Sequence, residues 1–269
     1  MRTRYKALLL GAAALVVVAV AWTVIGMAQG RQGGAPVAQP QRVVVVVTHV
    51  KPDMIATYED LIKNTGNPAL KKAGIPWRWT WAPVSGQGFT RISVQPIANY
   101  AALDQPNPLQ KALGTDGVAS YNAKLRPTIE STQNYAQTLR QDLSILSSSN
   151  APPAFAVVQV FQVAAGKGDE FTKIMTSDYL PNYKKAGVKD FFAYAVNFGA
   201  PVGQILTLRP IAKFAELDQP GLLNRAGLSA EAAAQINARR NAISTIIENG
   251  IVRYVPDLSF GTPEVRATN

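Results

Sequence analysis

Residues 96–106 read Pro-Ile-Ala-Asn-Tyr-Ala-Ala-Leu-Asp-Gln-Pro, and residues 210–220 read Pro-Ile-Ala-Lys-Phe-Ala-Glu-Leu-Asp-Gln-Pro. Eight of these eleven positions are identical, at an offset of 114 residues. The repetition continues outside this stretch, because Lys184-Lys185-Ala186-Gly187 matches Lys71-Lys72-Ala73-Gly74 and Asp257-Leu258-Ser259 matches Asp142-Leu143-Ser144. An internal repeat of this length indicates that the chain contains two copies of one structural unit.

The residues around the repeated stretch predict the same order of elements in both copies. The β-branched run 43–47 predicts a strand, and Pro52 predicts the start of a helix that ends near Gly74. Asp116 is expected to cap the second helix of the first copy, and Ser229 the matching helix of the second copy, which we expect to reach Ile247. Further strands are expected at residues 77–81, 89–95, 135–145, 156–163, 191–197, 204–209 and 251–260.

The order β-α-β-β-α-β is that of a ferredoxin-like unit. Such a unit carries both helices on one face of a four-stranded sheet, so that its other face has to be covered. We therefore expect an α+β protein made of two tandem ferredoxin-like β-α-β-β-α-β repeats, residues 42–146 and 154–260, which pack sheet to sheet as a pseudo-dimeric α/β barrel. The polar and proline-ended stretch 147–153 reads as the hinge between them.

The N-terminal segment of the chain predicts export. Residues 1–28 contain three basic residues, an apolar run over 7–25 and a small-x-small pattern that ends at Ala28, as in a signal peptide cleaved near Ala28. The alternative is an uncleaved N-terminal anchor, in which residues 7–25 are the only contact with a membrane. Residues 29–41 then form a flexible linker and residues 261–269 a tail, and the protein is secreted or periplasmic, or membrane-anchored and facing outside the cytoplasm.

Composition excludes several classes of site. The formal net charge of +10 is spread along the chain, without a basic run interleaved with aromatic residues, which argues against nucleic-acid binding. The chain has no cysteine and a single histidine, His49, so disulfides, thiolate metal sites and multi-histidine metal sites are excluded. We expect no metal and no cofactor, and we leave open whether the protein forms a homo-oligomer.

The repeat length, the element order and the stretch after the third strand of each copy resemble the dimeric α/β-barrel superfamily, with its antibiotic-biosynthesis-monooxygenase-like, NIPSNAP-like and chlorite-dismutase-like families. The resemblance covers residues 42–260. It implies a barrel fold, and either a cofactor-free oxygenase, a haem protein or a protein without known activity. Haem-binding members supply an axial histidine from a helix, in chlorite-dismutase-like proteins from the second repeat. Here the second repeat has no histidine, which argues against a haem site of that kind.

Positions that differ between the copies are the candidate site residues. On the third strands we expect the apolar positions Ile92, Val94, Leu206 and Leu208 to pack under the helices, and the alternating polar positions to face the barrel interior. His49 and Arg91 are the candidate catalytic residues, as general base and oxyanion stabiliser. The candidate ligand-binding residues are Trp77, Trp79, Trp81, Gln95, Gln162, Phe192, Tyr194 and Arg209.

These residues suggest two functions, and purely structural roles for the same residues stay open. The first is an exported small-molecule-binding or structural protein that holds an apolar or aromatic ligand, with an anionic or carbonyl group, between its two sheets. The second is a cofactor-independent monooxygenase or isomerase, which requires that His49 and Arg91 point into one cavity. Aromatic side chains on strands are otherwise core filler, and Arg91 and Arg209 could instead pair with carboxylates such as Glu130 or Glu248.

Overall fold

The computed structural model describes residues 41–147 and 151–263. The predicted signal segment or anchor, the linker up to residue 40, hinge residues 148–150 and tail residues 264–269 lie outside these described residues. Within the described part, no helix is long and apolar enough to cross a membrane.

The described residues form eight strands and seven α-helices, in two runs of the same order. The strands are β1 (Arg42–Val50), β2 (Trp79–Pro83), β3 (Thr90–Ile97), β4 (Ile129–Leu139), β5 (Phe155–Val163), β6 (Phe192–Phe198), β7 (Gln204–Ile211) and β8 (Ser244–Tyr254). The helices are α1 (Ile55–Leu61), α2 (Asn67–Lys72), α3 (Pro108–Leu125), α4 (Gly168–Ile174), α5 (Leu180–Lys185), α6 (Leu222–Arg225) and α7 (Ala230–Asn241). A single π-helical turn joins α1 to α2, and another joins α4 to α5.

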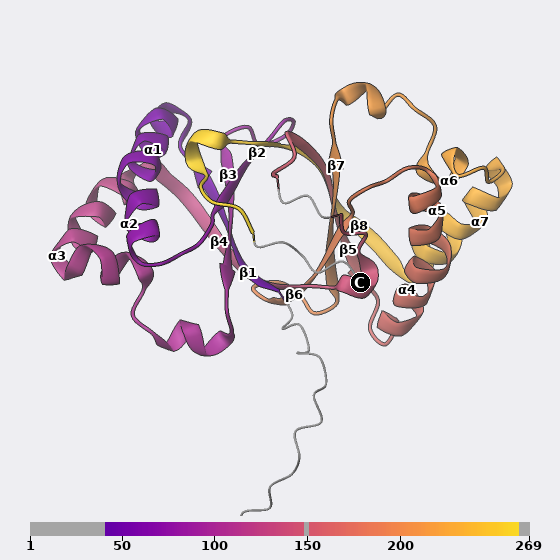
Figure 1. The fold of residues 1–269 in the computed structure, drawn as a ribbon, viewed down its shortest axis with the longest axis horizontal. Helices are drawn as coiled ribbons and strands as arrows, with labels where there is room; N and C mark the ends of the chain where they lie inside the picture. The colour runs from indigo at the N-terminus through magenta and orange to yellow at the C-terminus, as the bar shows by residue number, and fades with distance from the viewer. Residues whose placement is uncertain (1–40, 148–150, 264–269) are drawn as a thin grey trace, which may run out of the picture. The chain divides into compact units, whose positions relative to one another are not determined.

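All eight strands belong to one closed antiparallel barrel, in the order β1-β3-β2-β8-β5-β7-β6-β4. The strands of the first half lie as β4-β1-β3-β2, and those of the second half repeat this order as β8-β5-β7-β6. The halves meet at two seams, β2 with β8 and β4 with β6. Helices α1–α3 cover the barrel on one side and α4–α7 on the opposite side (Figure 1). The expected α+β barrel of eight strands is therefore confirmed, and closure leaves no sheet edge unpaired.

Several element boundaries differ from the prediction. β4 begins at Ile129 rather than 135, and β8 begins at Ser244 rather than 251, so Ile247 lies in a strand and not in a helix. These early residues are mostly exposed and do not alternate regularly between apolar and polar, and pairing with β1 and β5 makes them strands. α3 begins at Pro108, where the Asn107 side chain accepts the Leu109 N–H bond at 2.9 Å, and Gly114 interrupts it with non-helical backbone (φ 72°, ψ 175°), so a second helical segment begins next to the predicted cap residue Asp116.

The repeated Asp-Leu-Ser segments exchange contacts between the halves. After β4, Leu143 packs into the helix–sheet core of the second half, and after β8, Leu258 packs into that of the first half. The Ser144 hydroxyl accepts the Ala193 N–H bond at 3.0 Å, and the Ser259 hydroxyl accepts the Thr80 N–H bond at 2.9 Å. Each half thus supplies one leucine and one serine to the other.

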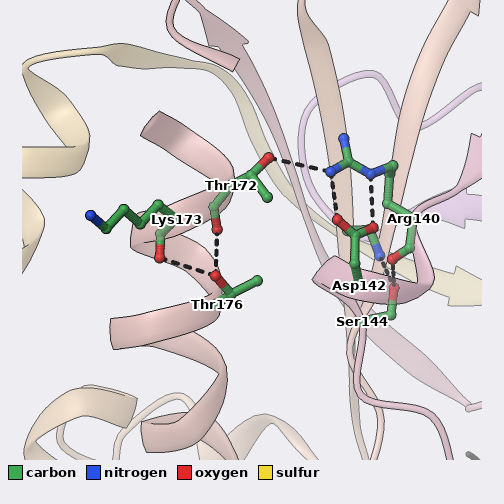
Figure 2. A network of polar contacts seen from close by, with 7 residues as sticks. Arg140, Asp142, Ser144, Thr172, Lys173 and Thr176 are labelled. Carbon is green, nitrogen blue, oxygen red and sulfur yellow. Dashed lines mark hydrogen bonds and ion pairs between the residues drawn. The ribbon is translucent and has the colours of Figure 1, made fainter. Parts of the chain in front are cut away.

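The first of these exchanges also involves an ion pair. Arg140 donates two parallel hydrogen bonds to Asp142, at 2.8 and 2.6 Å, and a third at 3.2 Å to Thr172 on α4 (Figure 2). Hydrogen bonds from the Arg140 guanidinium hold the pKa of the Asp142 carboxyl below its ordinary value. The segment after β4 is therefore fastened to a helix of the other half.

Candidate functional site

The barrel encloses a cavity of about 980 Å³. Its wall comes from alternate residues of the strands, such as Val43, Val45 and Val47 on β1, and from the turns at the strand ends. Interior positions of other small barrels are often filled by large side chains, but here a run of valines leaves room. The volume lies at the upper end of the range of small-molecule sites, which is about 300–1,000 Å³.

The third strands face the opposite way from the prediction. Ile92 and Val94 on β3, and Leu206 and Leu208 on β7, line the cavity, whereas the alternate polar residues face the helices. The prediction was wrong because it assigned the apolar face to the helix side. In the closed barrel Ile92 and Val94 face the interior that the two halves share, and Arg91 and Gln95 find partners outside it.

The contacts of Arg91 show which groups bind a polar side chain on the outer face of the sheet. Its guanidinium bonds the Glu59 carboxylate of α1 through Nε at 2.8 Å and Nη2 at 2.6 Å, and it also donates to the Thr90 carbonyl at 2.9 Å. Arg91 is not part of the cavity wall. The predicted role of Arg91 as oxyanion stabiliser in the barrel is therefore contradicted, since the side chain is used in the helix–sheet layer. Its carboxylate partner is Glu59, and not Glu130 or Glu248.

The aromatic residues do come together in the cavity wall. Trp79 and Trp81 lie on one face of β2 and Trp77 lies just before this strand, with successive ring centroids 5.4 and 6.5 Å apart, and the Tyr254 ring across the β2–β8 seam lies 5.5 Å from that of Trp81. The Trp79 indole N–H donates to the Gly261 carbonyl at 3.1 Å. Phe192 and Tyr194 of β6 line the same cavity. Five predicted ligand-binding residues thus line one cavity, with the tryptophans opposite Phe192 and Tyr194 across the barrel, and their role in binding stays a prediction.

The other three predicted ligand-binding residues do not line this cavity. Gln95 faces the helices and accepts a long hydrogen bond of 3.4 Å from Arg78. The Gln162 side chain donates to the Val202 carbonyl at 2.8 Å. Arg209 lines a second, smaller cavity of about 510 Å³ on the outer face of β7. Side-chain alternation along each strand separates Gln95 and Arg209 from the aromatic wall.

His49 lies at the end of β1 and lines the cavity. Its Nδ1 is 2.9 Å from the Thr90 hydroxyl oxygen. His49 can act as a base at Nε2 only in the tautomer in which Nδ1–H donates to Thr90. The structure thus brings His49 to the cavity without its predicted partner Arg91.

The cavity has two different ends. Because neighbouring strands are antiparallel, β1, β2, β5 and β6 end at the same mouth where the other four strands begin. His49, Gln133, Gln204 and Glu248 lie toward this mouth, whereas Trp77 and Phe192 lie toward the opposite end. The mouth that holds His49 and Glu248 is called the polar mouth, and the opposite end carries aromatic side chains together with Gln41, Gln137 and Asp190.

Tyr135 and Glu248 are cavity residues that the sequence did not single out as a site. The Tyr135 hydroxyl donates to the Gln133 side-chain oxygen at 2.8 Å. Burial, and secondly the negative charge of Glu248, raise the pKa of Tyr135. Neither residue could be found by comparing the copies, because both lie in strand segments whose register only the barrel defines.

The charged groups in the cavity wall are few. Among the described lining residues, the side chains that can carry a charge below pH 9 are His49, Asp190 and Glu248, and none is lysine or arginine. Asp190 accepts hydrogen bonds from the Ser147 N–H at 2.9 Å and the Ser147 hydroxyl at 2.8 Å. No group of three or more potential ligands for a metal ion occurs in the described part of the chain.

Comparison with known proteins identifies the fold. No protein-family model matches the chain, and no curated protein sequence does. An anthrone oxidase-like protein is similar in structure with a TM-score of 0.55 and 12% identity, over 86% of this chain and 97% of that one. A candidate monooxygenase from Lactobacillus acidophilus NCFM has a TM-score of 0.52 and 8% identity, over 84% of this chain and 99% of that one.

A third similar structure, a candidate monooxygenase from Fusobacterium nucleatum subsp. nucleatum, has a TM-score of 0.50 and 12% identity, over 80% of this chain and 91% of that one. These neighbours belong to the dimeric α/β-barrel superfamily. At such low identity the likeness shows that this chain shares their fold, and their activities are not transferred by it.

Proposed function

We propose that this protein is an exported small-molecule-binding protein of the dimeric α/β-barrel type, whose two ferredoxin-like repeats hold one apolar or aromatic molecule between their sheets. The observation that carries the proposal is the cavity of about 980 Å³ with three tryptophans in its wall. A barrel with a purely structural role would gain stability from filling this volume, because a void forfeits dispersion contacts. The open interior therefore favours binding over a structural role.

The alternative is a cofactor-independent monooxygenase or isomerase with His49 as general base. It is supported by the position of His49 in the cavity wall and by the candidate monooxygenases among the structural neighbours. In such a reaction His49 would take a proton from an acidic C–H bond, and the resulting carbanion would itself reduce O₂. Oxyanion stabilisation by Arg91 is not available, so this alternative lacks the electrophile that the sequence suggested.

Tryptophan fluorescence tests the binding function directly. Three of the four tryptophans of the chain line the cavity, so a bound ligand should change most of the emission. Anthrone, a tricyclic aromatic ketone, is a suitable first probe because of the anthrone oxidase-like neighbour. Full-length protein titrated with anthrone should show saturable quenching, with binding confirmed by calorimetry at an affinity of about micromolar or tighter.

Two variants localise the effect. Trp79→Ala should weaken binding by about tenfold or more, because it removes a ring from the wall. Phe89→Ala is the control, since this exposed aromatic residue lies next to β3 and is not part of the wall. Equal losses in both variants, or no binding by anthrone or by any molecule that co-purifies in native mass spectrometry, would refute the proposed function.

Oxygen uptake separates the two functions. If the alternative holds, the wild-type protein consumes O₂ in the presence of anthrone above the spontaneous rate, and His49→Gln abolishes the excess. If the wild-type protein binds anthrone and adds nothing to the spontaneous rate, the enzyme alternative fails for this substrate and the binding function remains.

A further inference from the structure

The sign of the charge in the cavity is opposite to that of the whole chain. The chain has a formal net charge of +10, yet the acidic side chains Glu248 and Asp190 lie in the cavity wall and no described lining residue is lysine or arginine. Glu248 takes part in none of the ion pairs among the described residues. Its charge reaches into the cavity, because it acts on Tyr135.

The arginines of the barrel strands cannot neutralise this charge at short range. Arg42 on β1, Arg91 on β3, Arg209 on β7 and Arg253 on β8 all alternate with cavity-facing residues, and none of them lines the cavity. Arg91 is already paired with Glu59, and Arg209 lines the separate outer cavity near Glu216. An anionic ligand in the barrel would therefore meet carboxylates and no opposite charge, and burying it unpaired would be costly.

The aromatic side chains of the cavity wall favour a cationic ligand, as the carboxylates do. Trp77, Trp79 and Trp81 of the cavity wall form a contiguous cluster in which successive rings are tilted or edge-to-face, and Tyr254 packs against Trp81 without lining the cavity. The faces of tryptophan rings carry negative partial charge and attract ammonium groups. Aromatic walls combined with a carboxylate are a general way to bind quaternary ammonium ions.

We propose that the barrel cavity selects organic cations, namely aromatic or alkyl amines and quaternary ammonium compounds, and that Glu248 at the polar mouth is a specificity-determining residue for that charge. This inference rests on the proposed binding function and replaces the anionic or carbonyl-bearing ligand that the sequence suggested. Asp190 contributes to the negative potential from the other end, where its carboxylate is held by Ser147. The fold tolerates the unpaired negative charge of Glu248 because its side chain is exposed and keeps most of its hydration.

Three probes of equal size and different charge test the inference on the full-length protein by calorimetry. They are naphthylmethyl trimethylammonium, its uncharged isostere with carbon in place of nitrogen, and naphthylacetate. The cation should bind at least about tenfold more tightly than the anion, and the preference should shrink as salt is added, because the mouth is exposed to solvent. The neutral probe reports binding to the apolar wall alone.

Glu248→Gln should weaken binding of the cation by about three- to tenfold, leave the neutral probe unchanged and strengthen binding of the anion. Glu130→Gln is the matched control, because it removes the same charge from an exposed strand residue that is not part of the wall. It should change none of the three affinities by more than about twofold.

The outcomes distinguish the two proposals. If the neutral probe binds but the anion binds as tightly as the cation, the inference of cation selectivity is overturned and the binding function stands. If the cation is preferred and Glu248→Gln has no more effect than Glu130→Gln, the role of Glu248 is overturned. If none of the three probes binds, the binding function and the selectivity inferred from it both fail.

Discussion

The two halves of the barrel share one backbone arrangement and differ in the layer between the sheet and the helices. In the second half this layer is a single large apolar cluster, which includes Phe171, Leu180 and Phe191. In the first half the corresponding positions at an offset of 113 are Tyr58, Asn67 and Arg78. The side-chain oxygen of Asn67 and the Nε of Arg78 are buried there without a hydrogen-bond partner, and burial lowers the pKa of Arg78.

The difference teaches where sequence divergence between the copies acts. Divergence on the inner face, as at Trp79 and Phe192, shapes the cavity. Divergence on the outer face, as at Arg91 and Ile205, decides only how each sheet packs on its helices. A residue that differs between the copies is therefore a candidate for binding only if its side chain is known to lie on the inner face of the barrel.

The largest expected effect comes from exchanging one pair of equivalent residues. Leu180→Asn should destabilise the protein by about 3 kcal/mol, because it puts an amide without a partner into an apolar core. Asn67→Leu should cost less than about 1 kcal/mol or stabilise the protein, since it removes a buried oxygen that has no partner. Urea unfolding of both variants measures the contrast. Equal losses would show that the two layers are not different in character.

A smaller effect is expected at the seam between β4 and β6. Gly199 and Gly86 are equivalent turn residues, with φ of 94° and 86°. A Cβ on Gly199 would clash with the Asn134 carbonyl oxygen, whereas nothing lies within 4 Å of one on Gly86. Gly86→Ala should therefore cost about 1 kcal/mol from backbone strain alone, and Gly199→Ala about 2–3 kcal/mol.

Thermal unfolding of these two glycine variants gives the measurement. If Gly199→Ala is as stable as Gly86→Ala, the β4–β6 seam can shift to accept the Cβ without loss of stability. The close contact between the halves would then not be needed for barrel closure.

The smallest effect concerns the ion pairs of the two exchanged segments, Arg140–Asp142 and Lys63–Asp257. Hydrogen bonds from Arg140 lower the pKa of Asp142, so this pair stabilises the folded state above the ordinary pKa of 3.8 and loses its effect as the pH falls through the lowered value. Because Asp142 is half exposed, Asp142→Asn should cost less than about 1 kcal/mol at pH 7 and nothing once the pH lies well below the lowered pKa of Asp142.

The comparison for this pair is Asp257→Asn, which removes the 3.0 Å ion pair with Lys63 at the equivalent seam. Both partners there are more than half exposed, so the loss should be smaller still. Urea unfolding at pH 7 and at acid pH measures both variants. A larger loss for Asp257→Asn, or one that grows toward low pH for Asp142→Asn, would contradict the prediction.

The sequence by itself predicted the α+β barrel of eight strands, which the structure confirms. The repeat at residues 96–106 and 210–220 pointed to it, because local patterns set strands and helices, and a one-sided apolar sheet has to be covered. Comparison of the two repeats also brought His49, Trp77, Trp79, Trp81, Phe192 and Tyr194 into the candidate list, because His49 and the aromatic positions differ between the repeats.

Only the tertiary structure decided which face of each strand looks inward. Period-two alternation separates Ile92 from Arg91 but does not say which of them meets the other sheet, because a helix layer and a barrel interior can both accept apolar side chains. Partners distant in sequence made the choice: Glu59 on a helix holds Arg91, and Leu258 from the other half completes the first core. Closure of the barrel also placed Glu248 at the mouth of a cavity whose wall is mostly apolar and aromatic. No local pattern in the sequence predicts this position of Glu248.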